Sequence, residues 1–218
     1  MANSWTRAWL ATLAVMIGAA ALVRNRHDTI TDVEDQVLDW LLDGTDTGFW
    51  DRFEWLGASW FVWTVAIVGA VLLLLFDRLL AAVLPLTVVG AEIAARLVRG
   101  AVERPRPEDS TALTSSYPSI EVVHAGVALG LIALVLWWFG LPRLLWQVVV
   151  EITVVLMLAV AIDQIADAQH WPSDTIGSAI VVAFALVSAA IVLERRPRRK
   201  GLIDFRRSSD NEPVPEAA

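Results

Sequence analysis

The sequence predicts an all-α fold, a bundle of six transmembrane helices. Its 218 residues are 56% hydrophobic, and the mean hydropathy is +0.58. This composition is too apolar for an ordinary soluble domain. A spanning helix needs roughly 20 mostly apolar residues, and six runs qualify: residues 8–23, 57–76, 79–98, 120–140, 144–162 and 174–193. We therefore expect one membrane domain over residues 1–200.

Tryptophans mark the ends of these apolar runs. Trp5 and Trp9 flank the start of the first run, Trp60 lies near the start of the second, and Trp146 and Trp171 lie at the starts of the last two. Tryptophan is enriched where a helix passes through the membrane–water interface. The placement indicates an aromatic belt at both interfaces and supports the six assigned spans.

The segment between the first two runs, residues 28–54, is rich in Asp and Glu. Within it, apolar residues recur at helical spacing among the acids: Ile30, Val37, Leu38, Leu41 and Leu42. This pattern is typical of an amphipathic helix that lies in the membrane surface. We expect such a helix on the outer face, between spans one and two.

Charge sets the expected orientation. The stretch 194–200 reads ERRPRRK, and such basic segments stay on the cytoplasmic side of a membrane. An even number of spans then places both termini in the cytoplasm of a plasma-membrane protein. Residues 201–218 are expected to form a disordered cytoplasmic tail. The net charge of −7 disfavours nucleic acid as a partner, and the absence of cysteine excludes disulfides and thiolate metal sites.

Three polar islands interrupt the apolar sequence, each at the end of a long apolar run. They read RGAVERPRP (99–107), YPSIEVVH (117–124) and DQIADAQHWPSD (163–174), and the topology places all three outside. Charge at a membrane boundary is costly unless it is paired or used. The arginines at positions 96, 99, 104 and 106 oppose the positive-inside rule, so we interpret them as held there by one anion-binding site.

The order and spacing of the islands resemble the signatures of the type-2 phosphatidic acid phosphatase superfamily, which also contains the vanadium haloperoxidases. The first signature is Lys, six residues, then Arg-Pro. Arg99 and Arg106-Pro107 fit this spacing with Arg in place of Lys. The resemblance implies that both arginines bind phosphate, and a guanidinium grips phosphate with two parallel hydrogen bonds.

The second signature, Pro-Ser-Gly-His, begins a helix, and here it reads Pro118-Ser119-Ile120-Glu121. Ser119 is expected to cap the helix and to bond phosphate. In the family, the glycine lets phosphate approach the backbone N–H closely, and the histidine protonates the leaving alcohol. Glu121 replaces that acid, and the helix N-terminus and nearby arginines favour its ionised form. We expect Glu121 to pair with Arg99 or Arg106.

The third signature is Ser-Arg, five residues, His, three residues, Asp. His170 and Asp174 match it, and the resemblance implies that His170 is the nucleophile and that Asp174 orients it. Asp163 and Gln164 stand at the Ser-Arg positions. Gln164 therefore replaces an arginine that would bind phosphate and stabilise transition-state charge.

The resemblance implies a metal-independent, cofactor-free phosphatase that acts on a membrane lipid phosphate or on a polyprenyl diphosphate such as undecaprenyl diphosphate. Because Glu121 replaces the general acid and Gln164 replaces a phosphate-binding arginine, we expect weak or lost phosphatase activity.

One alternative is a non-catalytic protein that binds a lipid headgroup or a partner protein. A lower-ranked alternative is a metal site, because Glu-x-x-His is a ligand spacing of helical bundles. Its ligands would be Glu121, His124, His170, Asp174 and Asp163. His124 either replaces the missing acid or, as we favour, packs against a neighbouring helix. Gly126 and Gly130 are expected to serve helix packing.

Overall fold

The computed structural model describes residues 2–44, 47–108, 110 and 114–195, and all regular elements in this part of the chain are helical. The all-α prediction is confirmed. The elements are α1 (Ala2–Gly44), α2 (Thr47–Trp50), the 3-10 turn η1 (Asp51–Phe53), α3 (Glu54–Gly57), α4 (Ser59–Leu74), α5 (Arg78–Val102), α6 (Ile120–Trp138), α7 (Arg143–Ala166) and α8 (Pro172–Glu194). The predicted tail, residues 201–218, lies outside the described residues.

The long helices agree with the six predicted spans. Among the described residues, five helices are individually long and apolar enough to cross a membrane, within α1, α5, α6, α7 and α8. A sixth crossing results if Gly48–Gly57 and Ser59–Leu74 count as one span bent by 44°. The chain is therefore an integral membrane protein with the predicted bundle, although the second span is broken where we expected a continuous helix.

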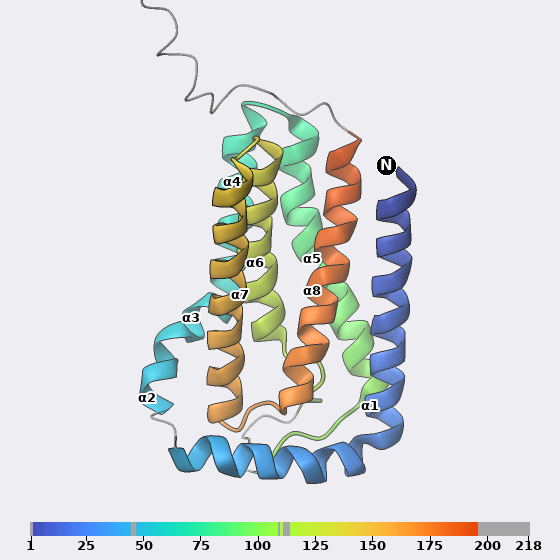
Figure 1. Cartoon of the computed structure of the whole chain (residues 1–218), viewed down its shortest axis with the longest axis vertical. Coiled ribbons are helices and arrows are strands. Elements are labelled where there is room, and N and C mark those ends of the chain that lie inside the picture. The colour runs from blue at the N-terminus through green and yellow to red at the C-terminus, as the bar shows by residue number, and fades with distance from the viewer. Residues whose placement is uncertain (1, 45–46, 109, 111–113, 196–218) are drawn as a thin grey trace, which may run out of the picture.

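Helix α1 supplies both the first span and the surface helix. Its backbone leaves helical geometry at Arg26 (φ −132°, ψ 17°), just beyond the point where the apolar run ends. Beyond this kink the helix turns and lies across the end of the bundle (Figure 1). Leu38 packs there with Ile165 and Trp171, which confirms an amphipathic helix between the first two spans. The side chains of residues 40–47 lie outside the described residues.

Helix α6 lies at the centre of the bundle, in contact with α4, α5, α7 and α8. Close packing against α8 depends on its two glycines. A Cβ at Gly126 would lie 2.7 Å from a Val182 methyl, and one at Gly130 would lie 2.3 Å from a Leu186 methyl. Since real Cβ atoms do not approach so closely, the predicted packing role of Gly126 and Gly130 is confirmed.

The break before α4 brings α3 onto the start of α6. Ala58 is extended (φ −68°, ψ 140°), so the chain changes direction between the two helices. The preceding residue, Gly57, lies so near α6 that a Cβ there would be 2.9 Å from the Cβ of Glu121. This approach places the α3–α4 break beside one of the predicted site residues.

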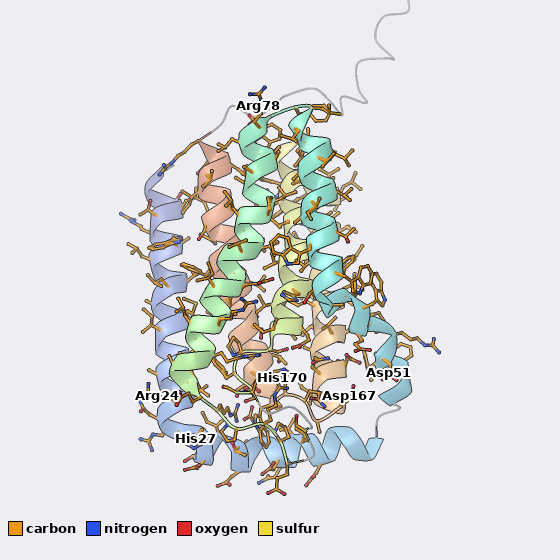
Figure 2. The ribbon with its side chains drawn as sticks, turned by 180° about the vertical axis from the view of Figure 1, so that it is seen from behind. Arg24, His27, Asp51, Arg78, Asp167 and His170 are labelled. Carbon is orange, nitrogen blue, oxygen red and sulfur yellow. The ribbon has the colours of Figure 1, made fainter. Side chains whose placement is uncertain are left out.

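The N-terminus and the end of α8 lie at the same end of the bundle (Figure 1). Arg78 lies at that end too, whereas His170 lies at the other end, near the crossing half of α1 (Figure 2). Both described termini on one side agree with an even number of membrane crossings.

Candidate active site

The predicted site residues come from three separated segments that meet at one end of the bundle. His170 lies in the short connection between α7 and α8, and Asp174 lies in the first turn of α8. Glu121 lies in the first turn of α6, and Arg106 lies in the segment after α5. Each is therefore placed at or just beyond a helix end, where side chains can reach one another across the bundle.

His170 is the centre of this arrangement and has no exposed surface. Its Nδ1 lies 3.4 Å from Oδ2 of Asp174, and its Nε2 lies 3.3 Å from Oε2 of Glu121. The guanidinium Nη1 of Arg106 lies 3.4 Å from the same Nε2. These separations are longer than ordinary hydrogen bonds. The imidazole therefore has a carboxylate at each ring nitrogen, and Arg106 lies beside the nitrogen away from Asp174.

The expected partner of Glu121 was wrong. We expected Arg99 or Arg106, but among the described residues its ion pair is with His170. The hydroxyl of Ser119 donates a hydrogen bond to the same Oε2, at 3.1 Å. The reason is positional: Glu121 and His170 meet directly, whereas the two arginines are held on backbone carbonyls.

Both predicted phosphate-binding arginines bond to backbone in the resting structure. Arg99 donates from Nη2 to the carbonyl of Pro118 at 2.8 Å. Arg106 donates from Nη1 to the carbonyl of Gln169 at 2.7 Å and from Nε to the carbonyl of Thr114 at 3.0 Å. The Arg99 bond ties α5 to the residue pair that precedes α6, and the Arg106 bonds tie the segment between α5 and α6 to itself and to the connection that precedes α8. They also orient Arg106 beside His170.

The other two predicted phosphate-binding residues lie in the same region. Ser119 caps α6, because its hydroxyl accepts from the backbone N–H of Val122 at 3.4 Å, as predicted. Gln164 is buried, and its side chain donates to Asp163 at 3.1 Å. The carbonyl of Gln164 accepts the backbone N–H of His170 at 3.1 Å. Gln164 thus supports the connection that carries His170.

Two opposing influences set the protonation of His170. Burial disfavours the cation and lowers the pKa of His170, but the carboxylates of Asp174 and Glu121 favour the cation more strongly. The net effect raises the pKa of His170 above its ordinary value. The two carboxylates therefore favour the protonated imidazole over the neutral ring, and a protonated ring has no lone pair for attack on phosphorus.

A polar cavity of about 510 Å³ adjoins these residues. Three carboxylates line it, those of Glu54, Glu121 and Asp167, against one guanidinium, that of Arg106. Burial and the neighbouring carboxylate of Asp51 raise the pKa of Asp167. The cavity is large enough for a phosphate headgroup, but its lining carries more negative than positive charge.

His124 packs between helices, as we favoured. Its Nδ1 lies 3.1 Å from the carbonyl of Gly57, and its Nε2 lies 3.4 Å from Oε1 of Glu92 on α5. A carbonyl can only accept, so Nδ1 carries a proton. His124 also lines the polar cavity, but its Nδ1 is bonded to the Gly57 carbonyl and its Nε2 faces Glu92, not His170.

The predicted metal set is not assembled as a unit. Glu121 and Asp174 contact opposite nitrogens of His170, so the imidazole ring separates them. Among the described residues, the carboxylates close enough to share an ion are those of Asp51, Asp163 and Asp167, within 4.8 Å of one another. Asp51 and Asp167 lie at the same end of the bundle as His170 (Figure 2). Only Asp163 belongs to both sets.

Comparison with known proteins identifies the architecture. No family model matches the sequence, and no curated protein matches it. A similar solved structure is the crystal structure of the first transmembrane PAP2 type phosphatidylglycerolphosphate phosphatase from Bacillus subtilis. It aligns over 88% of this chain and 98% of that chain, with a TM-score of 0.76 at 17% identity. The chain has the PAP2-type transmembrane phosphatase fold. The fold is therefore the one implied by the resemblance of the three islands to that superfamily.

Within this PAP2-type fold, sequence reasoning grouped the buried Arg104 with its neighbouring arginines and missed the buried Glu34 altogether. Arg104 is ion-paired with both Asp174 and Glu34. Two signals pointed to them. The Arg-Pro doublet occurs twice in succession in RPRP, and Glu34 follows Ile30 by four residues, which puts an acid on the apolar face of an amphipathic helix. Arg96, in contrast, is exposed and pairs with Glu92 on its own helix rather than joining the site.

Proposed function

We propose that this chain is a membrane phosphatase in which His170 takes a phosphoryl group from a lipid phosphate, and that Glu121 keeps its native activity low. The observation that carries this proposal is the setting of His170. The ring is buried, Asp174 faces its Nδ1, and Arg106 and Glu121 face its Nε2 beside a polar cavity. The PAP2-type fold supports the same reaction class.

The proposed reaction needs neutral His170 with its proton on Nδ1, facing Asp174. The Nε2 lone pair attacks phosphorus, and the bond between phosphorus and the ester oxygen breaks. The released alkoxide takes a proton from solvent water and leaves as the lipid alcohol. Water then attacks phosphorus, the P–N bond breaks, and inorganic phosphate leaves with His170 restored. Arg106 would stabilise charge on the non-bridging oxygens.

Two features support low native activity. The carboxylate of Glu121 lies against Nε2, where the phosphorus atom would have to approach. It also stabilises the protonated imidazole, which is not a nucleophile. In addition, carboxylates outnumber the guanidinium in the cavity lining by three to one, and carboxylates repel a phosphate dianion. Turnover then requires displacement of Glu121 and loss of a proton from His170.

We place the site on the extracytoplasmic face of the plasma membrane, with both termini in the cytoplasm. The basic stretch at 194–200 supports this orientation. The chain has no cysteine, so single introduced cysteines report accessibility directly. An impermeant thiol reagent added to intact cells should modify Glu108→Cys, beside the site, and spare Arg143→Cys, at the start of α7. The opposite pattern would reverse the orientation.

The charge of the cavity favours a second candidate function, the binding of a ligand without turnover. Three carboxylates and one guanidinium suit a headgroup that carries positive charge better than a bare phosphate. In this case the protein would bind membrane lipids of that kind, and His170 would serve only to hold Glu121 in place.

A phosphatase assay in detergent separates the two functions. Purified full-length protein would be given phosphatidic acid and, separately, undecaprenyl diphosphate, with His170→Ala as the matched control. We expect slow phosphate release that His170→Ala abolishes. We also expect an acid-labile phosphoryl group on the native protein. Release that is equal in native and His170→Ala protein, or no release with either substrate, would reject the phosphatase and leave the binding function.

A further inference from the structure

Arg104 is a charged residue that the bundle buries completely. Its side chain has no exposed surface, although it follows α5 in a segment near the membrane boundary. Its Nη1 donates to Asp174 Oδ1 at 2.9 Å and to Ser173 Oγ at 2.6 Å, and its Nη2 donates to Glu34 and to Thr31 Oγ1, at 3.1 Å to Thr31. The guanidinium therefore joins the kinked half of α1 to the first turn of α8.

These bonds leave Asp174 one orientation. Oδ1 accepts from Arg104, and Oδ2 accepts from the backbone N–H of Trp171 at 2.9 Å. With both oxygens held, Oδ2 is the atom that faces Nδ1 of His170, at 3.4 Å. The indole of Trp171 also lies under the guanidinium, with its ring centroid 5.1 Å from Cζ of Arg104. Rotation of the Asp174 carboxylate would break contacts on both sides.

Glu34 holds Arg104 in turn. One of its oxygens pairs with the guanidinium, and the other accepts from the backbone N–H of Ser173 at 2.5 Å. That N–H is among the first of α8, which have no partner within the helix. Glu34 thus caps α8 from a residue 139 positions earlier in the sequence. The crossing half of α1 is tied to the turn that carries Asp174.

We propose that Arg104 is a positioning residue for His170. It fixes the carboxylate of Asp174 so that the proton of neutral His170 stays on Nδ1 and the lone pair stays on Nε2, and Glu34 secures Arg104. A carboxylate held at one ring nitrogen sets the tautomer of an imidazole. The importance of this tautomer rests on the proposed function, because Nε2 is the nitrogen beside Glu121 and Arg106, two of the residues that line the polar cavity.

In a different interpretation, the network around Arg104 contributes only to stability. Buried ion pairs are costly to desolvate and contribute little net stability compared with apolar packing. A network kept only for stability would leave the His170 tautomer unchanged when Arg104 loses its charge. The tautomer therefore distinguishes positioning from stability, and it can be measured whether or not the protein turns over a substrate.

The test uses the full-length protein in detergent with ¹⁵N-labelled histidine. The chain has three histidines, so their ring signals can be assigned by substitution, and the partly exposed His27, far from Asp174 in the sequence, serves as an internal reference. At a pH above the titration of His170, native protein should show the Nδ1–H tautomer. Asp174→Asn and Arg104→Gln should each lower the ratio of Nδ1–H to Nε2–H about tenfold, the size expected for residues coupled by roughly 1.4 kcal/mol.

The control and the double variant decide whether Arg104 acts through Asp174. Arg78→Gln, at the start of α5 and at the end of the bundle opposite His170, should leave the ratio at the native value (Figure 2). Arg104→Gln should have no further effect in the Asp174→Asn background, and Arg104→Lys should restore part of the native ratio. An unchanged ratio in Arg104→Gln, or an equal further fall in the Asp174→Asn background, would overturn the proposal.

Two outcomes need separate treatment. If Arg104→Gln does not fold, Glu34→Gln replaces it, because the amide oxygen can still accept from Ser173 while Arg104 loses one of its two carboxylate partners. We expect a smaller fall of the same sign, and a native ratio in Glu34→Gln would then overturn the proposal. If the phosphatase assay fails while the ratios change as expected, the positioning role stands and the proposed reaction falls.

Discussion

Replacement of Glu121 by glutamine should raise phosphate release at neutral pH, although the family signature has its acid at this position. In the resting structure, Oε2 of Glu121 lies 3.3 Å from Nε2 of His170 and stabilises the protonated ring. Glutamine keeps the size of the side chain and its bond from Ser119 but removes the charge. More of the His170 population is then neutral and able to attack phosphorus.

The size of the effect follows from the distance and the exposure. Two unit charges 3.3 Å apart interact by about 5 kcal/mol at an effective dielectric constant of about 20 and by about 1.3 kcal/mol in water. The side chain of Glu121 is 41% exposed, so solvent screens the pair and the lower figure is the better guide. A loss of about 1 kcal/mol raises the neutral fraction of His170 about fivefold below its titration midpoint.

The assay is the initial rate of phosphate release from phosphatidic acid across a pH series. We expect a roughly fivefold higher rate in Glu121→Gln than in native protein on the acid side of the profile, and a smaller gain at high pH where His170 is already neutral. Glu108→Gln, an exposed carboxylate of the neighbouring segment, is the matched control and should leave the profile unchanged. Loss of activity in Glu121→Gln would show that Glu121 is the working acid and would refute this reasoning.

Other substitutions test the signature, the charge and the packing of the site. Reverting all three departures from the family signatures, Ile120→Gly, Glu121→His and Gln164→Arg, should raise phosphatase activity well above the native level. Ile120→Gly alone or Gln164→Arg alone should change the activity little. Equal gains from those single changes would contradict this. Because the pKa of His170 is raised in the fold, its contribution to the free energy of unfolding is complete below the ordinary histidine pKa of about 6.5 and is lost as pH rises through the folded value. Denaturant unfolding across that range should show the decline in native protein and not in His170→Gln, and a decline that persists in the variant would assign it to another group. Gly57→Ala should lower the free energy of unfolding by about 1–3 kcal/mol, because its Cβ would lie 2.9 Å from that of Glu121. Gly90→Ala, whose Cβ would meet nothing within 4 Å, is the control, and equal stability of the two variants would contradict the packing argument.

Several expectations from the sequence agreed with the structure because they depended on local patterns. Apolar runs of sufficient length became long helices, and Ser119 became the cap of α6. The helical spacing of Ile30 and Leu38 among acids indicated a surface helix, and α1 supplies one after its kink. Each of these features depends on residues within a few helical turns of one another, so the sequence alone predicts it.

The contacts of individual charges did not follow from the sequence. Glu121 had two arginines as plausible partners and pairs with His170 instead. Arg104 was grouped with the other arginines of its segment, but it alone is buried between Glu34 and Asp174. Differences of a few ångströms decide such pairings, and those distances depend on how distant helices pack.

The sequence by itself therefore determined the class of the protein and the chemistry available to it: an apolar bundle with three polar islands, a histidine and an aspartate at signature spacing, and a glutamate where the family has its acid. The tertiary structure decided how that chemistry is arranged. It placed Glu121 against His170, broke the second span so that Gly57 contacts α6, and laid α1 across the site so that Glu34 reaches Arg104. The physical reason is that hydrophobic length acts along the chain, whereas the pairing of buried charges is settled only when separate helices have packed together.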